Sequence, residues 1–386
     1  MIPFFSRRNQ VYPVLRQDRP AVEKHFSHME DWERETRLYQ VLGGALPHPA
    51  VLHTEPGLLV TEYCPHPSLL DVLERQERGD FSPAPWAALA DWLRRCFQIC
   101  GQLPAEGNLR NFLWDAGRES ILGLDFESFR PCPPEESAAE LSAALLAYDP
   151  AGTPVKRQAA GLLVQAFRVP EETLADARLR LRLRREARPS PPPLSGIVLA
   201  GGSSRRMGTC KAALKLSGQT LLERQAEKLR ALGIRDILLS GEDCPALPGT
   251  RVIPDALPRR GPLGGLHACL RAAEHPACLV LSVDTPLAPR AALAKLRDVH
   301  RGGVTVLRRS GMEEPLTGVY DSTLFQAIGS LIEPGGAPVR ALERIAARSF
   351  FDYAGPPELL MNCNTPQEYA AAVALAERYG RWGLAL

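Results

Sequence analysis

The stretch from Leu199 to Lys211 constrains the fold of this chain more than any other. It reads Leu-Ala-Gly-Gly-Ser-Ser-Arg-Arg-Met-Gly-Thr-Cys-Lys and continues an apolar run that begins at Ile197, which is typical of a short buried strand. Gly201 and Gly202 carry no side chains, so the backbone can turn sharply there and bring its N–H groups close to a phosphate. The sequence therefore predicts a strand that ends in a phosphate-binding turn.

Basic residues follow this turn closely. Arg205, Arg206 and Lys211 lie where a triphosphate would need positive charge. The stretch is not a Walker A loop, because no Gly-Lys-Ser/Thr occurs at the required spacing, and it lacks the Gly-x-Gly-x-x-Gly of dinucleotide-binding folds. The remaining interpretation is the loop of a nucleotidyltransferase.

Length and composition exclude several other classes of protein. With 386 residues, the chain is long enough for two or three domains. A net charge of +2 provides no general field for nucleic acid or a membrane surface, so we expect neither as a partner. No apolar run is long enough to span a membrane, and the first residues do not resemble a signal peptide. The nine cysteines are odd in number and form no Cys-x-x-Cys pair, which favours reduced thiols and a cytoplasmic location.

Strand and helix patterns alternate from residue 195 to residue 386, which predicts an α/β domain with a mostly parallel sheet covered on both faces. Asp284 follows Cys278–Val283, the most strand-like run of the chain. Ligands of open parallel sheets bind beyond the carboxyl ends of the strands, so Asp284 should face the same crevice as the Gly201–Gly202 turn. A carboxylate repels a triphosphate unless a divalent cation lies between them, and Mg²⁺ is the cation that phosphate substrates favour.

The pattern Leu-Ala-Gly-Gly-x-Ser-x-Arg-Met-Gly-x-x-Lys resembles the opening motif of the molybdenum cofactor guanylyltransferases. The resemblance covers residues 195–386 and implies a Rossmann-like nucleotidyltransferase domain. It also implies catalytic roles for Arg206, Lys211 and Asp284. The nucleotide-binding residues that it implies are Leu199, Ala200, Gly201, Gly202, Lys211, Asp255 and Asp284.

Further motifs agree with this family. Asp255 matches the aspartate that precedes the Gly-Pro-Leu loop, found here as Gly261–Gly265, which in the family lies against the bound substrates. Glu314–Tyr320 resembles the Pro-Leu-x-x-x-Tyr strand that faces the acceptor. Arg340 occupies a basic stretch on the pterin side of the family site.

The segment Asn362-Cys-Asn-Thr-Pro-Gln-Glu368 resembles the Asn-x-Asn-Thr-Pro motif of the same family. Thr365 and Glu368 have the spacing of a capping box, and Pro366 suits the first turn of a helix. Asn364 precedes that cap, and we expect it at the end of a strand, where it helps Asp284 to hold the metal.

The resemblance implies transfer of GMP from GTP to the terminal phosphate of molybdenum-loaded molybdopterin, with release of pyrophosphate. Two enzymes of the same fold remain as alternatives: a cytidylyltransferase acting on the same cofactor and a sugar-phosphate nucleotidyltransferase. An alternative of another class is a binding protein that delivers the cofactor by docking molybdoenzymes or their chaperones.

The first half of the chain resembles a small α+β kinase-like domain of the aminoglycoside-phosphotransferase and lipopolysaccharide-kinase kind. Lys24 and Glu35 match the nucleotide-binding lysine and its helix partner, and Asn111 and Asp125 match the two metal-binding positions. The sequence departs from the pattern at Glu106, a glutamate where the family has the catalytic aspartate. The domain is either an active phosphotransferase or a degenerate one that binds a nucleotide or a partner.

Composition also suggests where the domains end. The helix expected over residues 171–188 carries a run of arginines, which is more typical of a solvated helix C-terminus than of a nucleic-acid site. The prolines that follow it cannot continue a helix and read as a stiff linker. We therefore expect a kinase-like domain over 1–188, a linker over 189–194 and the nucleotidyltransferase domain over 195–386.

Overall fold

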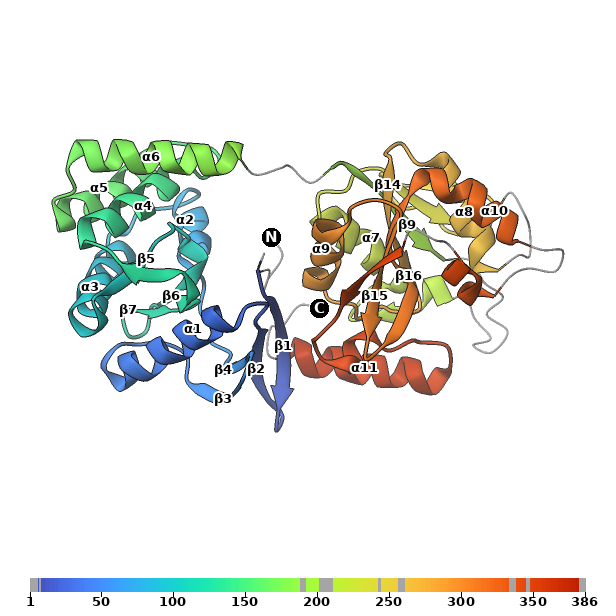
Figure 1. Ribbon diagram of the computed structural model, residues 1–386, viewed down its shortest axis with the longest axis horizontal. Coiled ribbons are helices and arrows are strands. Elements are labelled where there is room, and N and C mark those ends of the chain that lie inside the picture. Colours follow the sequence, from blue (N-terminus) through green and yellow to red (C-terminus); the bar gives the residue numbers. More distant parts are fainter. Residues whose placement is uncertain are drawn as a thin grey trace. The chain divides into compact units, whose positions relative to one another are not determined.

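A computed structural model describes two compact units of the chain (Figure 1). The C-terminal unit comprises Met1–Pro20 and Pro191–Leu386, and the N-terminal unit comprises Ala21–Ser190. The described residues are 6, 8–187, 192–200, 211–241, 244–255, 261–332, 338–344 and 348–381.

The C-terminal unit is built on a mixed sheet, whose described strands follow the order β13-β12-β9-β14-β16-β15-β17. Strands β13, β12, β9 and β14 are mutually parallel, as are β15 and β17, whereas β16 runs antiparallel to both its neighbours. The predicted α/β class is confirmed. The strands are β9 (Leu194–Leu199), β12 (Ile237–Ser240), β13 (Arg251–Ile253), β14 (Ala277–Ser282), β15 (Val304–Arg309), β16 (Met312–Asp321) and β17 (Arg348–Asp352).

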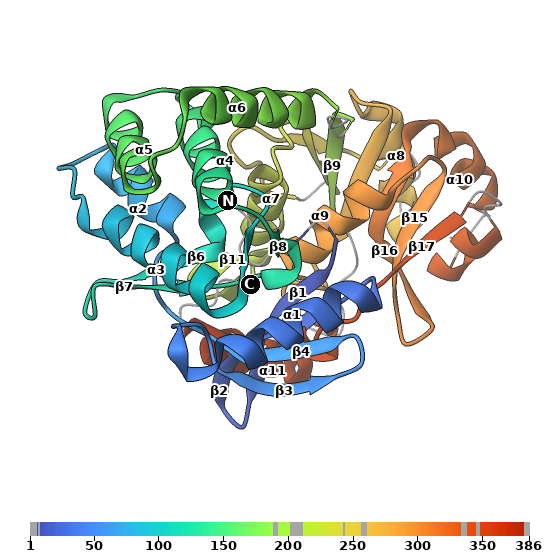
Figure 2. The same ribbon diagram turned by 60° about the vertical axis from the view of Figure 1, so that its left-hand side comes forward.

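Helices cover both faces of this sheet. Helices α7 (Leu221–Ala231) and α9 (Arg290–Val299) lie on one face, and α8 (Pro262–Ala272) and α10 (Phe325–Leu331) lie on the other (Figures 1 and 2). Strand β9 is buried along its whole length because both faces are covered. A Cβ on Gly196 would lie 2.6 Å from Cδ1 of Leu229 on α7, so the close approach of helix and strand requires glycine there.

The first strand of the sequence also belongs to the C-terminal unit. The ring of Tyr12, on β1 (Gln10–Arg16), lies 4.8 Å from that of Tyr353, and Nε2 of Gln10 donates to the carbonyl of Asp352. The other elements of this unit are η4 (Lys211–Ala213), β10 (Lys215–Leu216), β11 (Gln219–Thr220), η5 (Ser322–Leu324), η6 (Val339–Arg344), η7 (Pro357–Leu360) and α11 (Pro366–Gly380).

The N-terminal unit is α+β. It begins with an antiparallel sheet in the order β2-β4-β3, formed by β2 (Arg19–His25), β4 (Leu58–Glu62) and β3 (Val51–Glu55). Two small antiparallel pairs follow: β5 (Gln102–Pro104) with β8 (Phe129–Pro131), and the hairpin of β6 (Phe112–Asp115) with β7 (Ser120–Gly123). The helices are α1 (Met29–Leu42), η1 (Gly43–Ala45), α2 (Leu69–Gln76), α3 (Ala84–Cys100), η2 (Leu109–Asn111), η3 (Phe126–Ser128), α4 (Pro134–Ala147), α5 (Pro154–Phe167) and α6 (Glu171–Glu186).

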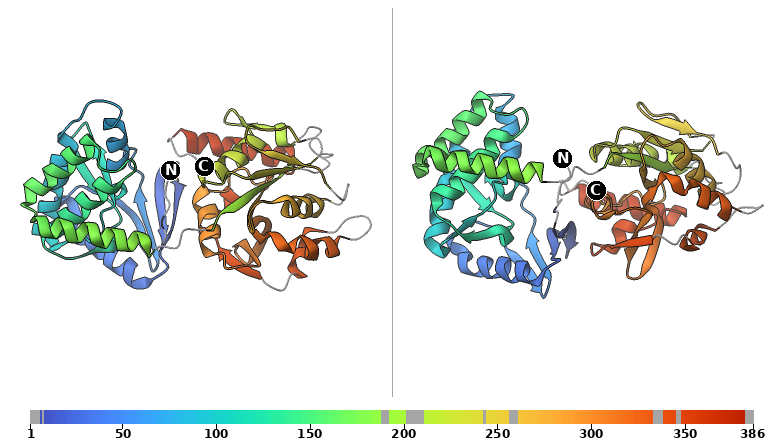
Figure 3. Two further views of the ribbon diagram at one scale, coloured as in Figure 1. Left: turned by 90° about the horizontal axis from the view of Figure 1, so that it is seen from above. Right: turned by 45° about the horizontal axis from the view of Figure 1, so that its top comes forward.

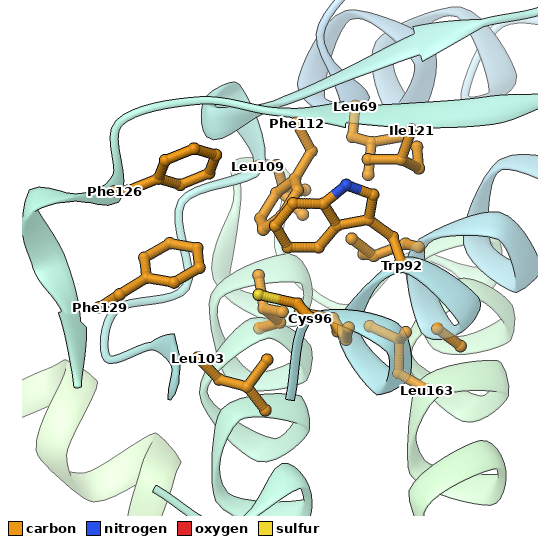
Figure 4. Close-up of a cluster of buried hydrophobic side chains, with 14 of the residues drawn as sticks. Leu69, Trp92, Cys96, Leu103, Leu109, Phe112, Ile121, Phe126, Phe129 and Leu163 are labelled. Atoms are coloured by element: carbon orange, nitrogen blue, oxygen red, sulfur yellow. The ribbon is translucent and has the colours of Figure 1, made fainter. Parts of the chain in front are cut away.

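An aromatic cluster forms the core of the N-terminal unit (Figure 4). The indole of Trp92 on α3 lies 5.6 Å from the ring of Phe112 and stacks 6.3 Å from that of Phe126. Phe129 packs against the edge of the same indole at 6.3 Å. Because Phe126 and Phe129 are both buried in this core, they hold the chain between them in place beside it.

Helices α4, α5 and α6 pack together in the same unit (Figure 3). The arginines that the sequence shows near the end of α6 are partly neutralised, because Arg180 and Arg184 both form ion pairs with Glu140 of α4. Within the part of the chain that the structure describes, no helix has both the length and the apolar character needed to cross a membrane.

Candidate functional site

Four parallel strands of the C-terminal unit end in one row. Leu199 of β9 is in register with Ser240 of β12 and with Ser282 of β14, and Ser240 is in register with Ile253 of β13. The residues that follow these positions therefore meet at the carboxyl edge of the sheet, where open α/β sheets bind their ligands.

Lys211, Asp284 and Asn364 come together at this edge. Nζ of Lys211 donates to Oδ1 of Asp284 at 2.9 Å and to Oδ1 of Asn364 at 2.7 Å. The side chains of Lys211 and Asp284 are 16% and 29% exposed, so solvent still reaches the pair. Two hard oxygen donors thus converge on one cation, here the ammonium group, and the same pair of oxygens suits a divalent metal.

The backbone around Asp284 is held on two sides. Its carbonyl accepts from the N–H of Cys363 at 2.8 Å, which joins the end of β14 to the segment that carries Asn364. The N–H of Val283 donates to the carbonyl of Leu199 at 3.2 Å, and the N–H of Asp284 donates to Oγ of Ser282 at 3.2 Å. The carboxylate of Asp284 is therefore presented from a fixed turn.

The predicted cap of α11 is confirmed and positions Asn364. Oγ1 of Thr365 accepts from the N–H of Glu368, and Oε2 of Glu368 accepts from the N–H of Thr365 at 2.9 Å. The same oxygen accepts from the N–H of Asn364 at 2.7 Å. This hydrogen bond is the main reason why the pKa of Glu368 is lowered. The expected place of Asn364 at a strand end is wrong: it follows the 3₁₀ helix η7 and an irregular segment. The Asn364 N–H bond to Glu368 performs the positioning instead.

The remaining predicted nucleotide positions lie along the same edge. Leu199 is the buried last residue of β9, and Ala200 follows it directly. Asp255 follows β13 by two residues and approaches the start of α8, where a Cβ on Gly265 would lie 3.2 Å from its Oδ1. The same Cβ would lie 2.7 Å from Oγ of Ser240, so glycine at 265 lets the ends of two strands approach this helix.

Gly201, Gly202, Arg205 and Arg206 lie outside the described residues. Arg340 lies on η6 with an exposed side chain.

A second cluster of charges occurs in the N-terminal unit. Nζ of Lys24, on β2, lies 2.7 Å from Oε2 of Glu35 on α1 and 2.8 Å from Oε2 of Glu127 on η3. It also forms an ion pair with Asp125. The side chains of Lys24, Glu35 and Glu127 are buried, whereas that of Asp125 is 35% exposed.

The electrostatics of this cluster follow from burial and crowding. Burial lowers the pKa of Lys24, but Asp125, Glu35 and Glu127 together raise it well above its usual value. Burial raises the pKa of Glu35 to about 7, against the opposing effect of Lys24. The carboxylate oxygens of Glu35, Asp125 and Glu127 lie within 4.8 Å of one another, so the group has the geometry of a cation site.

Asparagines and a left-handed backbone complete the cluster. Nδ2 of Asn111 donates to Oδ2 of Asp125 at 3.2 Å, and Nδ2 of Asn108 donates to Oδ1 of Asn111 at 2.9 Å. Asp125 has φ 59° and ψ 59°, a left-handed conformation that aspartate tolerates better than most residues. The structure therefore brings together Lys24, Glu35, Asn111 and Asp125, four of the five residues that the sequence singles out in this unit.

Glu106 is the exception among those five. Its side chain is exposed, and within the described residues it makes no hydrogen bond or ion pair with Lys24 or Asp125. Glu127 joins the cluster although the sequence analysis does not select it. The available signal was its place two residues after Asp125 in Asp-Phe-Glu, where a short helical turn brings both carboxylates to one side.

Residues 196–349 match the MobA-like NTP transferase domain family. Over 198 residues the chain is 30% identical to the probable molybdenum cofactor guanylyltransferase of Pelotomaculum thermopropionicum, and the match covers 48% of this chain and 96% of that protein. The molybdenum cofactor guanylyltransferase of Rhizobium meliloti is 33% identical over 202 residues, with 47% and 91% covered. The crystal structure of molybdopterin-guanine dinucleotide biosynthesis protein A from Archaeoglobus fulgidus aligns with a TM-score of 0.40 and 20% identity over 48% of this chain and 100% of that one.

Proposed function

This chain belongs to the molybdenum cofactor guanylyltransferase family, and we propose that its C-terminal unit transfers GMP from GTP to the terminal phosphate of molybdenum-loaded molybdopterin. The observation that carries the proposal is the convergence of Lys211, Asp284 and Asn364 at the carboxyl edge of the sheet. A phosphate oxygen of the acceptor forms a bond to the α-phosphorus of GTP, the bond to the bridging oxygen breaks, and pyrophosphate leaves with that electron pair.

Asp284 and Asn364 fit a Mg²⁺ ion because their side-chain oxygens already converge on one cation. When bound, Mg²⁺ would neutralise charge on the phosphates and orient them for in-line displacement. Lys211 would move its ammonium group from these oxygens to the phosphates of GTP, whose charge develops on the leaving pyrophosphate. Arg206 and the backbone N–H groups of Gly201 and Gly202 are proposed to hold the same phosphates, and Asp255 to contact the nucleoside.

Nothing in this set of residues requires a covalent intermediate. Lys211, Asp284 and Asn364 position and neutralise, and the acceptor phosphate is itself the nucleophile. In this proposal the chain therefore contributes to catalysis by binding the substrates, orienting them and neutralising their charge.

The test supplies the full-length chain with Mg²⁺, one nucleoside triphosphate at a time and molybdenum-loaded molybdopterin, and measures pyrophosphate. We expect release with GTP, and only when molybdopterin is present, which separates transfer from hydrolysis. A preference for CTP would assign the chain to cytidylyl transfer. Release with a sugar phosphate as the acceptor, and not with molybdopterin, would replace the cofactor reaction altogether.

For the N-terminal unit we propose binding of a magnesium nucleotide. Three carboxylates and one lysine in a single cluster carry this second proposal, because the carboxylates suit a divalent cation and the lysine suits a phosphate. The exposed Glu106 gives no support to phosphoryl transfer. Binding of a fluorescent ATP analogue with Mg²⁺ should persist in an Asp284→Asn chain and be lost in a Lys24→Met chain. Equal binding by both variants would contradict it.

Two further expectations remain proposals. Cys96, Cys132, Cys269, Cys278 and Cys363 are buried free thiols, and thiols persist in reducing compartments, so we propose that the reaction takes place in the cytoplasm. Delivery of the finished cofactor to molybdoenzymes or their chaperones would give the N-terminal unit a role in docking. A pull-down of molybdoenzymes with and without residues 21–190 tests that role.

A further inference from the structure

The turn that carries Asp284 is fixed through its carbonyl groups. The carbonyl of Asp284 accepts from the N–H of Cys363, and three more carbonyls of the turn accept from side chains of one helix, α7. They belong to Ser282, Thr285 and Pro286. The helix therefore supports the backbone of the turn.

Gln225 and Lys228 make most of these contacts. Nε2 of Gln225 donates to the carbonyl of Ser282 at 2.5 Å and to that of Thr285 at 3.1 Å, so one amide spans the turn from end to end. Nζ of Lys228 donates to the carbonyl of Pro286 at 2.6 Å. Nε of Arg224 donates to the carbonyl of Pro286 as well, at 3.0 Å.

Both residues occupy positions where the helix would be expected to bury apolar side chains. Leu221, Gln225 and Lys228 follow one another at helical spacing on the buried face of α7, and Gln225 and Lys228 are 0% and 2% exposed. Polar groups at such positions are costly unless they are hydrogen-bonded. Here the amide of Gln225 and the ammonium group of Lys228 donate to carbonyls of the turn that carries Asp284, which explains why these positions are polar.

Lys228 shows the cost most clearly. Burial lowers the pKa of its ammonium well below the usual value, and the neighbouring charges of Arg224 and Arg290 lower it further. A leucine at this position would extend the apolar face of α7 without that penalty. The lysine provides a long donor that reaches the Pro286 carbonyl, two residues after Asp284.

We propose that Gln225 and Lys228 are positioning residues that hold the 282–286 turn so that Asp284 and Asn364 share one divalent cation. This inference rests on the proposed function for its catalytic consequence, and on the hydrogen bonds of α7 for its structural part. Groups that orient metal ligands typically affect metal affinity or activity about 10–100-fold when they are removed.

The experiment uses the full-length chain with Gln225→Glu, which replaces the amide donor by an acceptor, and Lys228→Met, which keeps the stem and removes the donor. Mn²⁺ binding is followed by electron paramagnetic resonance. The part of the bound-Mn²⁺ signal that is lost in Asp284→Asn is assigned to the proposed metal site at Asp284. We expect each variant to weaken this part of Mn²⁺ binding about tenfold and to lower kcat for GMP transfer about 10–100-fold, with a smaller change in KM for GTP. Lys228→Arg should restore both readouts.

Arg230→Met is the matched control. Arg230 lies on the same helix and its Nη2 donates to the carbonyl of Pro248 at 2.6 Å, a proline carbonyl in a different loop. We expect this variant to retain wild-type kcat and Mn²⁺ affinity. That result would show that the effects of the Gln225 and Lys228 variants do not arise merely from losing any hydrogen bond between α7 and a carbonyl.

The outcomes separate the two proposals. If the Gln225 and Lys228 variants bind Mn²⁺ and turn over like the wild type while only their melting temperature falls, the positioning role is overturned. If Mn²⁺ affinity responds as expected but the wild type transfers no GMP, positioning stands and the proposed function fails. Should either variant not fold, Gln225→Asn and Lys228→Arg decide: the shorter amide must weaken Mn²⁺ binding and the arginine must not.

Discussion

Each unit contains a lysine that is held by an aspartate and a further oxygen donor, but the two surroundings differ in charge. Among the described residues, the ammonium group of Lys211 contacts one carboxylate, Asp284, and one neutral amide, Asn364, so the charges in these contacts balance, and the site remains partly exposed. Lys24 faces three carboxylates and is buried.

The difference teaches what each site is suited to accept. In the C-terminal unit, the proposed function requires the lysine to exchange its partners, with a metal replacing it at the two oxygens and the phosphates of GTP receiving it. In the N-terminal unit the carboxylates outnumber the lysine, so the lysine is held firmly and the cluster still favours additional positive charge. A balanced site suits turnover of a charged substrate, whereas an excess of carboxylates suits retention of a cation.

The largest expected effect comes from removing the buried lysine. Lys24→Met leaves three carboxylates without their cation, and breaking a buried ion pair from one side typically costs about 3–5 kcal/mol. We expect the N-terminal unit to lose that much stability in chemical denaturation and to regain part of it in millimolar Mg²⁺. GMP transfer by the folded protein should be unchanged. Full stability without Mg²⁺ would mean that the carboxylates are protonated or hydrated in the native state.

The next effect is on rate. Lys211→Ala and Asp284→Ala each remove an electrostatic group that we propose acts on the phosphates, and loss of such a group typically raises the barrier by about 2.7–4 kcal/mol. We therefore expect GMP transfer to fall at least about a hundredfold in steady-state assays, while the melting temperature stays near that of the wild type because the cluster is partly exposed. Lys215→Ala, an exposed lysine close in sequence, is the control. A near-normal rate in either variant would remove that residue from the mechanism.

The contrast between the two sites also shows what the sequence could predict. Asp284 was predicted to face the same crevice as the turn that follows β9, because both follow strands of one parallel sheet and strand ends in register must meet at one edge. The capping box at Thr365 was predictable from local spacing alone. Both inferences needed only the local spacing of residues and the common direction of parallel strands.

Other features depended on contacts between distant segments. Gln225 and Lys228 are visible in the sequence as polar residues on an apolar helix face, but nothing local indicates which turn they support. Tyr12 on β1 packs against Tyr353, which joins residues at opposite ends of the chain, and no local pattern indicates that contact. Patterns of hydrophobicity specify elements, and long-range packing decides their partners.

Asp236, which directly precedes β12, is a further buried carboxylate with a cationic partner, here Arg251. Burial raises the pKa of Asp236, but hydrogen bonds from Ser195, the N–H of Glu274 and Arg251 outweigh it, so the pKa is lowered overall. Because the unfolded group titrates near 3.8, this stabilisation is complete above that pH and is lost as the pH falls further. Asp236→Asn should cost about 1–3 kcal/mol in urea unfolding at pH 7.

The same variant tests the sign of that dependence. Between pH 7 and pH 3 the difference in unfolding free energy between wild type and Asp236→Asn should stay constant down to about pH 4 and then narrow, because the wild type alone loses an ionised partner of Arg251. A difference that narrows between pH 7 and pH 5 would contradict a lowered pKa.

The smallest effect separates stability from positioning at the cap of α11. Thr365→Ala removes the side-chain acceptor of the Glu368 N–H and should cost about 1 kcal/mol in thermal unfolding. The rate of GMP transfer should be unchanged, because the N–H of Asn364 is held by Glu368 rather than by Thr365. Glu368→Ala removes that anchor and should lower the rate about tenfold. Equal rates in the two variants would show that the amide of Asn364 finds its place without the cap, and would leave Asp284 as the only positioned donor among the described residues of the balanced site.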